Sequence, residues 1–174
     1  VMGAGAVGCY YGAMLARAGH DVVLVGRRRH VDAIRRDGLR FETAQGTETI
    51  GVDAQASAQA VAGAQIVLFC VKSTDTDVAA VEMAPYLADD AMVLSLQNGV
   101  DNAERIRAHV RQRVESAIVY VAAAMAGDGH VRHYGRGELL LARGALTPSV
   151  LDDFASAGVA VLETDNLVGA LWGK

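Results

Sequence analysis

The sequence is short of several features, and each shortage excludes a class of protein. It has two cysteines, Cys9 and Cys70, each inside an apolar stretch, which favours a reduced cytoplasmic protein over a disulfide scaffold. No apolar run approaches the ~20 residues that a membrane span needs, so no membrane partner is expected. Basic residues number 16 against 20 acidic ones, and the net charge of −4 gives no support to nucleic-acid binding. The chain starts at Val1 without the basic segment of a secretory signal.

Lysine is also scarce, since only Lys72 and Lys174 occur among the 16 basic residues and all the others are arginines. A lysine can lose its proton or donate it as a compact acid, whereas an arginine stays protonated. A lysine retained in so arginine-rich a chain suggests a task that arginine performs poorly. The alternative for each is an ordinary surface lysine, and nothing local to Lys174 argues against it.

Apolar residues are abundant, at 52% with 21% charged, which excludes a disordered chain. Short β-type runs alternate with helical patterns, as is typical of βαβ units and a parallel sheet. The expected strands are Val22–Val25, Leu39–Thr43, Thr49–Asp53, Ile66–Val71, Met92–Leu96, Val114–Ala124, Glu138–Ala142 and Val159–Leu162. The expected helices are Val7–Ala18, Val31–Asp37, Thr74–Leu87, one from an Asp101 cap to Val110, Pro148–Ala157, and one from Asn166 onward. Glycine turns are expected at Gly3–Gly8 and Gln97–Gly99. Leu39–Thr43 and Thr49–Asp53 are expected to form a hairpin around Gln45-Gly46, and Gly127–Gly137 is expected to be a glycine-spaced turn and hairpin region.

The first turn reads Gly3-Ala4-Gly5-Ala6-Val7-Gly8 and matches G-x-G-x-x-G between a strand and a helix. In this motif the first glycine allows the tight turn, the second admits a pyrophosphate, and the third lets helix and strand lie close together. The N-terminus of the following helix offers free N–H groups to the phosphates. The motif therefore predicts an α/β fold of the Rossmann type, a doubly wound, mostly parallel sheet. A glycine turn without a ligand is the alternative.

The tip of the second expected strand indicates which dinucleotide is bound. Sites selective for NAD place a carboxylate there, on the ribose 2′-hydroxyl. Here Val22–Val25 is followed by Gly26 and Arg27, with no carboxylate at the tip. An arginine can pair with a 2′-phosphate, so NADPH is favoured over NADH. The neighbouring Arg28 and Arg29 are read as a solvated start of the next helix.

Two further residues fall at the edge of the sheet where ligands bind in this class of fold. Lys72 follows the strand Ile66–Val71, and Asn98 follows the strand Met92–Leu96. Carboxyl ends of parallel strands meet at one edge, so both side chains can reach a ligand there. A plain Asn-Gly turn explains Asn98 equally well.

The remaining histidines and cysteines indicate no metal site. His130 and His133 would face opposite sides of a strand, which argues against joint coordination. His20, His30 and His109 fall in turns or at helix ends and are expected to be solvated. Cys9 and Cys70 are expected to be core residues rather than nucleophiles.

With these residues in order, the chain resembles the ketopantoate reductase (2-dehydropantoate 2-reductase) family along its whole length. The matching features are Gly3–Gly8, Arg27, Cys70-Val71-Lys72, Gln97-Asn98-Gly99, the hairpin stretch Asp128-Gly129-His130-Val131 with Gly135-Arg136-Gly137, and Leu171-Trp172-Gly173-Lys174.

The resemblance implies roles for individual residues. NADPH would be held by Gly3, Ala4, Gly5, Ala6, Val7 and Gly8 and by Arg27, which would contact the 2′-phosphate. Lys72 and Asn98 would bind both the cofactor and the substrate, and Ala124 would be a further cofactor contact. Lys174 would be the catalytic lysine, the proton donor.

The reaction implied is NADPH-dependent reduction of a small 2-oxo acid, 2-dehydropantoate or a close analogue. Negative charge develops on the ketone oxygen during hydride transfer, and a protonated Lys174 can stabilise it and then donate its proton. A β-hydroxyacid dehydrogenase and a non-catalytic NADP(H)-binding sensor module are the alternatives. The set Lys72, Asn98 and Lys174 favours an enzyme, because a sensor needs no proton donor.

Both ends of the sequence are abrupt, which leads us to expect a piece of a longer protein. Residues 1–165 are expected to form the NADP-binding domain, and residues 166–174 to begin a helical second domain that completes the substrate site and allows a homodimer. Leu167, Leu171 and Trp172 would then lie against apolar surface in that longer protein. On its own, the chain is expected to be inactive.

Overall fold

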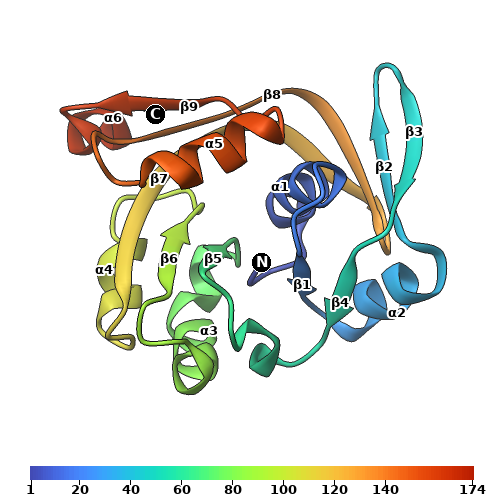
Figure 1. The fold of residues 1–174 in the computed structure, drawn as a ribbon, viewed down its shortest axis with the longest axis horizontal. Coiled ribbons are helices and arrows are strands. Elements are labelled where there is room, and N and C mark those ends of the chain that lie inside the picture. The colour runs from blue at the N-terminus through green and yellow to red at the C-terminus, as the bar shows by residue number, and fades with distance from the viewer.

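The computed structural model describes residues 1–174, and its centre is a parallel sheet of short, mostly apolar strands (Figure 1). The strands are β1 (Val23–Val25), β4 (Asp53–Gln55), β5 (Ile66–Phe69), β6 (Met92–Ser95) and the first part of β7 (Arg113–Gly127). Met2 bridges β1 and β5 through Val25 and Phe69, so the order across the sheet is β4-β1-Met2-β5-β6-β7, all parallel. With the Met2 segment counted as the first strand, this is the Rossmann order 3-2-1-4-5-6.

Helices cover both faces of this sheet because its strands are apolar on both sides. Alternate strand residues such as Leu24, Leu68 and Leu94 share a core with α1 (Ala6–Arg17) and α2 (Arg28–Asp37). The residues between them, such as Val67 and Val93, share a second core with α3 (Thr76–Met83) and α4 (Asn102–Arg107). The two cores confirm the doubly wound arrangement.

A second group of strands extends from the far end of β7. There β7 pairs antiparallel with β8 (His130–Ala142), and β8 pairs in parallel with β2 (Leu39–Thr43) and β9 (Val161–Thr164). A hairpin joins β2 to β3 (Gly46–Ile50), as expected. Five strand pairs are parallel and two antiparallel, so the α/β fold is mixed and mostly parallel.

The expected turn and hairpin region over Gly127–Gly137 contains a hairpin, but its turn is shorter than expected. Only Asp128 and Gly129 separate β7 from β8, and the other residues belong to strands. Gly137, at φ 151°, sits where a Cβ atom would lie 2.0 Å from the Tyr10 hydroxyl oxygen. The spaced glycines therefore allow close packing and irregular pairing of β8 with β7. Glycine has this role in strands as well as in turns.

Several other boundaries also differ. The expected strand Thr49–Asp53 is divided, because β3 ends at Ile50, paired with β2, and Asp53 begins β4, which pairs with β1. The expected helix Thr74–Leu87 is the turn η2 (Ser73–Asp75), α3, and the turn η3 (Ala84–Tyr86), which contains Pro85. Asp101 occupies the N-cap position of α4, but its side chain makes no capping hydrogen bond.

The remaining elements are the turn η1 (Ala58–Val61), α5 (Pro148–Ser156) and α6 (Leu167–Trp172). Asn166 caps α6 by accepting a hydrogen bond from the Gly169 N–H at 2.9 Å. Val168 and Trp172 on α6 are largely exposed. No helix of the structure has both the length and the apolar character that crossing a membrane requires.

Candidate cofactor and active site

The three glycines of the first turn occupy three different environments. Gly3 has φ 109°, and a Cβ there would lie 2.7 Å from the Val71 nitrogen. A Cβ on Gly8 would lie 2.1 Å from the Gly3 carbonyl oxygen, whereas one on Gly5 would meet nothing within 4 Å. The first glycine is thus required by backbone conformation and the third by the approach of α1, while the second leaves open space. These are the three roles that the motif predicts.

The N-terminus of α1 is free to bind an anion. Gly5 is the N-cap residue and provides no side-chain cap, and the first turn contains no acidic residue. Its N–H groups therefore keep the hydrogen-bonding capacity and partial positive charge that favour a phosphate.

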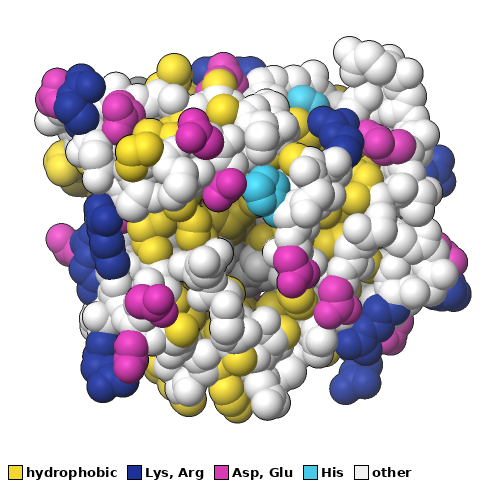
Figure 2. All heavy atoms as spheres, in the orientation of Figure 1, with side chains coloured by type: hydrophobic (Ala, Val, Ile, Leu, Met, Phe, Trp, Pro, Cys, Tyr) yellow, Lys and Arg dark blue, Asp and Glu magenta, His cyan; other side chains and the backbone are white.

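A cavity of about 970 Å³ opens beside this turn. Its volume falls within the range of pockets that hold cofactors, and Figure 2 shows apolar side chains around a hollow with charged ones at its rim. Its polar and charged lining comes from Arg27, Arg28, Arg29, His30, Lys72, Asp75, Glu82 and Asp128. Gly3, Ala4, Gly5 and Ala6 form its floor at the end of the sheet.

The basic residues at the tip of β1 differ in their partners. The Arg29 Nε lies 3.4 Å from the Asp128 carboxylate, and the His30 Nδ1 lies 3.1 Å from the same group without hydrogen-bond alignment. Arg27 is exposed, lines the cavity and makes no side-chain hydrogen bond or ion pair. Arg27 therefore keeps its full donor capacity for an incoming anion. His30 is only 9% exposed, so the expectation that it is solvated is wrong; it lies on the face of α2 turned to the core.

The sheet edge brings Asn98 and Lys174 together. The Lys174 amino group donates a hydrogen bond to Asn98 Oδ1 at 3.0 Å and another to the Val119 carbonyl oxygen. Lys72 lines the cavity and is exposed, and it contacts neither of them through a hydrogen bond. Lys72 and Asn98 nevertheless follow adjacent parallel strands, β5 and β6.

The Lys174 amino group lies in a cationic and aromatic environment. It is 5.4 Å from the centre of the Tyr120 ring, over which the Arg136 guanidinium also lies, at 4.3 Å. Partial burial and, to a lesser extent, the charge of Arg136 lower the pKa of Lys174 below its ordinary value. A lysine with a lowered pKa gives up its proton more readily, which suits a proton donor.

Part of the cavity wall was not predicted from the sequence. Met125, Ala126, Gly127 and Asp128 line it, whereas Ala124 is exposed on β7 just before them and is outside the lining. These four residues form the tip of the β7–β8 hairpin, which lies against α2, since a Cβ on Gly129 would meet Ala33 and Ile34. The Asp-Gly pair signals a turn, but it does not reveal which helix the turn meets.

The other reactive side chains have structural partners. His130 lies 2.8 Å from Glu42, and His133 donates to the Arg136 carbonyl oxygen at 2.6 Å. No group of three or more metal-ligating side chains gathers anywhere in the structure. Burial raises the pKa of both Cys9 and Cys70 to about 12, so their thiols stay protonated. Cys9 is a core residue, as expected, whereas Cys70 is half-buried and lines the cavity.

The strand order, the glycine turn and the uncapped helix N-terminus together define a Rossmann-type dinucleotide-binding domain. The comparisons with known proteins then give its family. The model of the ketopantoate reductase PanE/ApbA family matches residues 1–145, and the chain belongs to this family.

Several proteins that are similar to this chain are named 2-dehydropantoate 2-reductase or ketopantoate reductase. The chain is 34% identical to the 2-dehydropantoate 2-reductase of Pyrococcus horikoshii over 181 residues, covering all of this chain and 58% of that protein. It is 35% identical to the enzyme of Halobacterium salinarum over 182 residues, again covering all of this chain, and 60% of that protein. Among solved structures, a PanE/ApbA family ketopantoate reductase from Ralstonia eutropha JMP134 matches with a TM-score of 0.95 and 57% identity, over 98% of this chain and 57% of that one. The chain thus spans somewhat under two thirds of the length of these relatives.

The fold is shared more widely. A ternary structure of D-mandelate dehydrogenase with NADH and anilino(oxo)acetate matches with a TM-score of 0.85 at 22% identity, over 98% of this chain and 58% of that one. At this identity the likeness shows the fold alone.

Proposed function

We propose that this chain is the cofactor-binding part of a reductase that uses NADPH to reduce a small 2-oxo acid, 2-dehydropantoate or a close analogue. The observation that carries the proposal is the hydrogen bond between Lys174 and Asn98, whose backbone is bonded to Ser73, the neighbour of the cavity-lining Lys72. A cofactor cradle alone would suit a sensor. A lysine with a lowered pKa, bonded to Asn98, suits proton transfer.

Three features of this chain suit the cavity to a dinucleotide phosphate. Gly5 leaves open space at the turn, the first turn of α1 is uncapped, and Arg27 is without a partner at the tip of β1. The pyrophosphate would bind at Gly3–Gly8 and the 2′-phosphate at Arg27. D-mandelate dehydrogenase, whose structure contains NADH, shows that this fold also accepts the cofactor without that phosphate. The free Arg27 supports NADPH for this chain.

When bound, the reduced nicotinamide supplies a hydride to the carbonyl carbon of the substrate. Lys174 would stabilise the charge that develops on the ketone oxygen and donate the proton that yields the hydroxyl group. Asn98 would hold the Lys174 amino group in place and, with Lys72, contact the substrate and the nicotinamide ribose. Ala124 would make a further cofactor contact from β7.

This chain matches only part of the length of its relatives. The rest of the substrate site, and any homodimer contact, would come from the part of the full-length protein that lies outside this match. The exposed Val168 and Trp172 on α6 would be covered there. Residues 166–174 would then begin a helical second domain.

The proposal is tested with the full-length protein and a panel of 2-oxo acids, following the loss of NADPH absorbance. We expect one substrate, 2-dehydropantoate or a near analogue, to be reduced with a kcat/KM well above the others. Tight NADPH binding without reduction of any 2-oxo acid would overturn the proposal in favour of a sensor module. Turnover confined to β-hydroxy acids with NADP would indicate a β-hydroxyacid dehydrogenase.

A further inference from the structure

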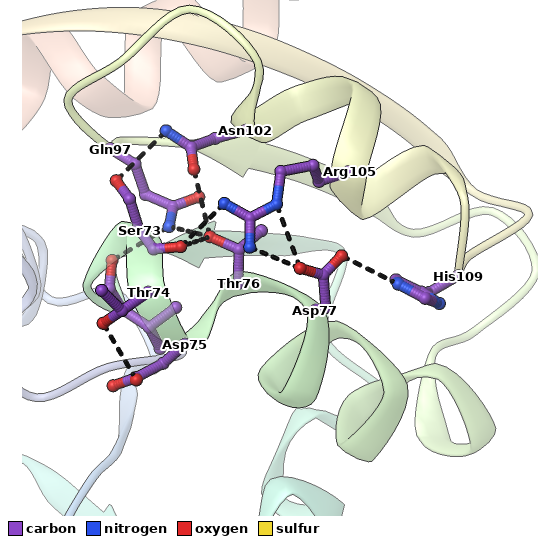
Figure 3. A network of polar contacts seen from close by, with 10 residues as sticks. Ser73, Thr74, Asp75, Thr76, Asp77, Gln97, Asn102, Arg105 and His109 are labelled. Atoms are coloured by element: carbon purple, nitrogen blue, oxygen red, sulfur yellow. Dashed lines mark hydrogen bonds and ion pairs between the residues drawn. The ribbon is translucent and has the colours of Figure 1, made fainter.

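Buried polar side chains gather behind the candidate active site. Of the six buried polar residues in the chain, four lie here: Thr76, Ser95, Gln97 and Asn102, with 0%, 3%, 7% and 3% of their surface exposed. Burying such groups costs free energy unless they are hydrogen-bonded. All four are bonded, and Figure 3 shows Thr76 joined to Gln97 and to Asn102 in the network they form.

The network joins two loops that follow neighbouring strands. We refer to residues 71–75 as the Lys72 loop and to residues 97–101 as the Asn98 loop. The Gln97 side-chain amide donates to the Val71 carbonyl oxygen at 3.0 Å and to Thr76 Oγ1 at 2.8 Å. Its own oxygen accepts from the Ser95 hydroxyl at 3.1 Å. Gln97 is therefore fixed by bonds at both ends of its amide.

Asn98 is held through its backbone. Its carbonyl oxygen accepts from the Ser73 hydroxyl at 2.9 Å and from the Asn102 side-chain amide at 2.8 Å. The Asn102 side-chain oxygen is in turn 3.1 Å from Thr76 Oγ1. The Asn98 side chain, by contrast, is exposed, and its oxygen accepts the bond from Lys174.

A second set of bonds ties the network to α3 and α4. Arg105 donates to the Ser73 carbonyl oxygen at 2.8 Å and, through Nε, to the Asp77 carboxylate at 3.0 Å. His109 lies 3.1 Å from the other oxygen of Asp77. These bonds to Arg105 and His109 lower the pKa of Asp77 and keep it charged (Figure 3).

We propose that Thr76, Gln97 and Asn102 are positioning residues: they fix the Lys72 loop against the Asn98 loop and, through Asn98, set where the Lys174 amino group lies. The role of Lys174 in this statement rests on the proposed function. The coupling of the two loops stands on the hydrogen bonds alone.

Stability by itself does not call for such a network. Replacing both partners of a buried hydrogen bond by apolar groups of similar shape is nearly neutral for stability. A fully satisfied polar network instead specifies one geometry, because each bond is directional. Lys72 and Asn98 have exposed side chains, so their placement depends on the backbone that the network holds. Misplacing a reacting group by about 1 Å can cost about 100-fold in rate.

The test compares four variants of the full-length protein with wild type. Thr76→Val removes the central hydroxyl at nearly constant shape, and Thr76→Ser retains it. Gln112→Met is the control for buried polarity, since Gln112 is 8% exposed and bonds the Ala88 carbonyl oxygen at the opposite edge of the sheet. Thr47→Val repeats the substitution at an exposed residue of β3 whose side chain makes no hydrogen bond.

Three readouts are taken on each variant: amide hydrogen exchange of the two loops, steady-state kinetics with the best 2-oxo acid, and the melting temperature. For Thr76→Val we expect faster exchange in both loops together and a kcat lowered by about 10- to 100-fold, with KM for the 2-oxo acid changed much less. Thr76→Ser should restore both. Gln112→Met should lower the melting temperature without either effect, and Thr47→Val should resemble wild type.

The outcomes separate the two proposals. Unchanged exchange in both loops of Thr76→Val overturns the coupling. The positioning role is overturned if Thr76→Val shows faster exchange with an unchanged kcat. It is also overturned if Gln112→Met loses as much kcat as Thr76→Val does. A wild-type protein that reduces no 2-oxo acid overturns the proposed function and with it the effect on Lys174, while the exchange data still decide whether the loops are coupled.

Discussion

Replacing glycine by alanine should have different effects at two positions of the glycine turn that lie three residues apart. Gly5 has φ −88° and open space around its missing side chain, so alanine fits the folded protein there. Gly8 faces the Gly3 carbonyl oxygen, which a Cβ would approach to 2.1 Å. We therefore expect Gly5→Ala to impair cofactor binding and Gly8→Ala to impair folding.

The size of each effect follows from these contacts. Relieving the contact at Gly8 requires roughly 1 Å of movement between α1 and the turn, and such overpacking costs about 1–3 kcal/mol. At about 2–4 °C per kcal/mol for a protein of this size, the melting temperature should fall measurably. Gly5→Ala changes only an N-cap glycine, worth at most about 1 kcal/mol. Its methyl group would enter the cavity where the pyrophosphate binds, and a similar steric cost of about 1–3 kcal/mol weakens NADPH binding by about 5- to 150-fold.

Thermal melting and NADPH titration by fluorescence on the full-length variants measure both effects. Gly51→Ala is the matched control, because Gly51 is exposed, has no positive φ and has open space around it outside the cavity. If Gly5→Ala bound NADPH as tightly as Gly51→Ala, the pyrophosphate could not lie against Gly5. If Gly8→Ala melted with the control, the close approach of α1 to the turn would be wrong.

Three further predictions concern the charged residues. Arg27→Ala should weaken NADPH by about 10- to 150-fold, the loss of a hydrogen bond to a charged group, and leave NADH nearly unchanged; equal losses in titrations of both cofactors would contradict a 2′-phosphate contact. Lys174→Ala should lower kcat by about 10²–10⁴ in steady-state assays while NADPH affinity stays close to wild type, and a near-normal kcat would remove the proton-donor role. Arg136→Gln should raise the pKa of Lys174, because the charge of Arg136 contributes to lowering it. Activity requires the protonated lysine and is lost as pH rises through its pKa, so the alkaline limb of the pH–rate profile should move to higher pH; a limb that stayed in place or moved down would contradict this reasoning.

The cofactor half of the site could be predicted from the sequence because its signals are local. The Gly3–Gly8 turn is a contiguous motif, and the strands β5 and β6 are short apolar runs ended by Lys72 and by Asn98. Parallel pairing brings such strand ends to one edge without further information. The structure confirms the strands and the sheet, while the roles of the residues at the edge stay predictions.

The length of the strands β7 and β8 could not be predicted in the same way. Gly135 and Gly137 carry a turn signal in the sequence, yet both lie inside β8, where the pairing with β7 outweighs local preference. His30 similarly has the sequence setting of a surface residue at a helix start. Its burial depends on the hairpin tip that reaches α2 and places Asp128 beside it. The sequence also gives no sign of the Thr76 network, whose partners Gln97 and Asn102 lie 21 and 26 positions away along the chain.

The two halves of the site come from different parts of the fold, and this has a consequence for catalysis. The cradle of the cofactor is built by the first turn and the tip of β1, which the parallel sheet fixes directly. Lys174 follows α6, which lies against β8, and its amino group reaches the sheet edge over Val119 and Tyr120 of β7. The two loops lie between these parts: the Lys72 loop meets the first turn, where a Cβ on Gly3 would lie 2.7 Å from the Val71 nitrogen, and it is bonded to the Asn98 loop, whose Asn98 side chain accepts from Lys174. Because the cradle makes no bond to Lys174, cofactor affinity and proton transfer should respond to separate substitutions, and only changes at the two loops should affect both.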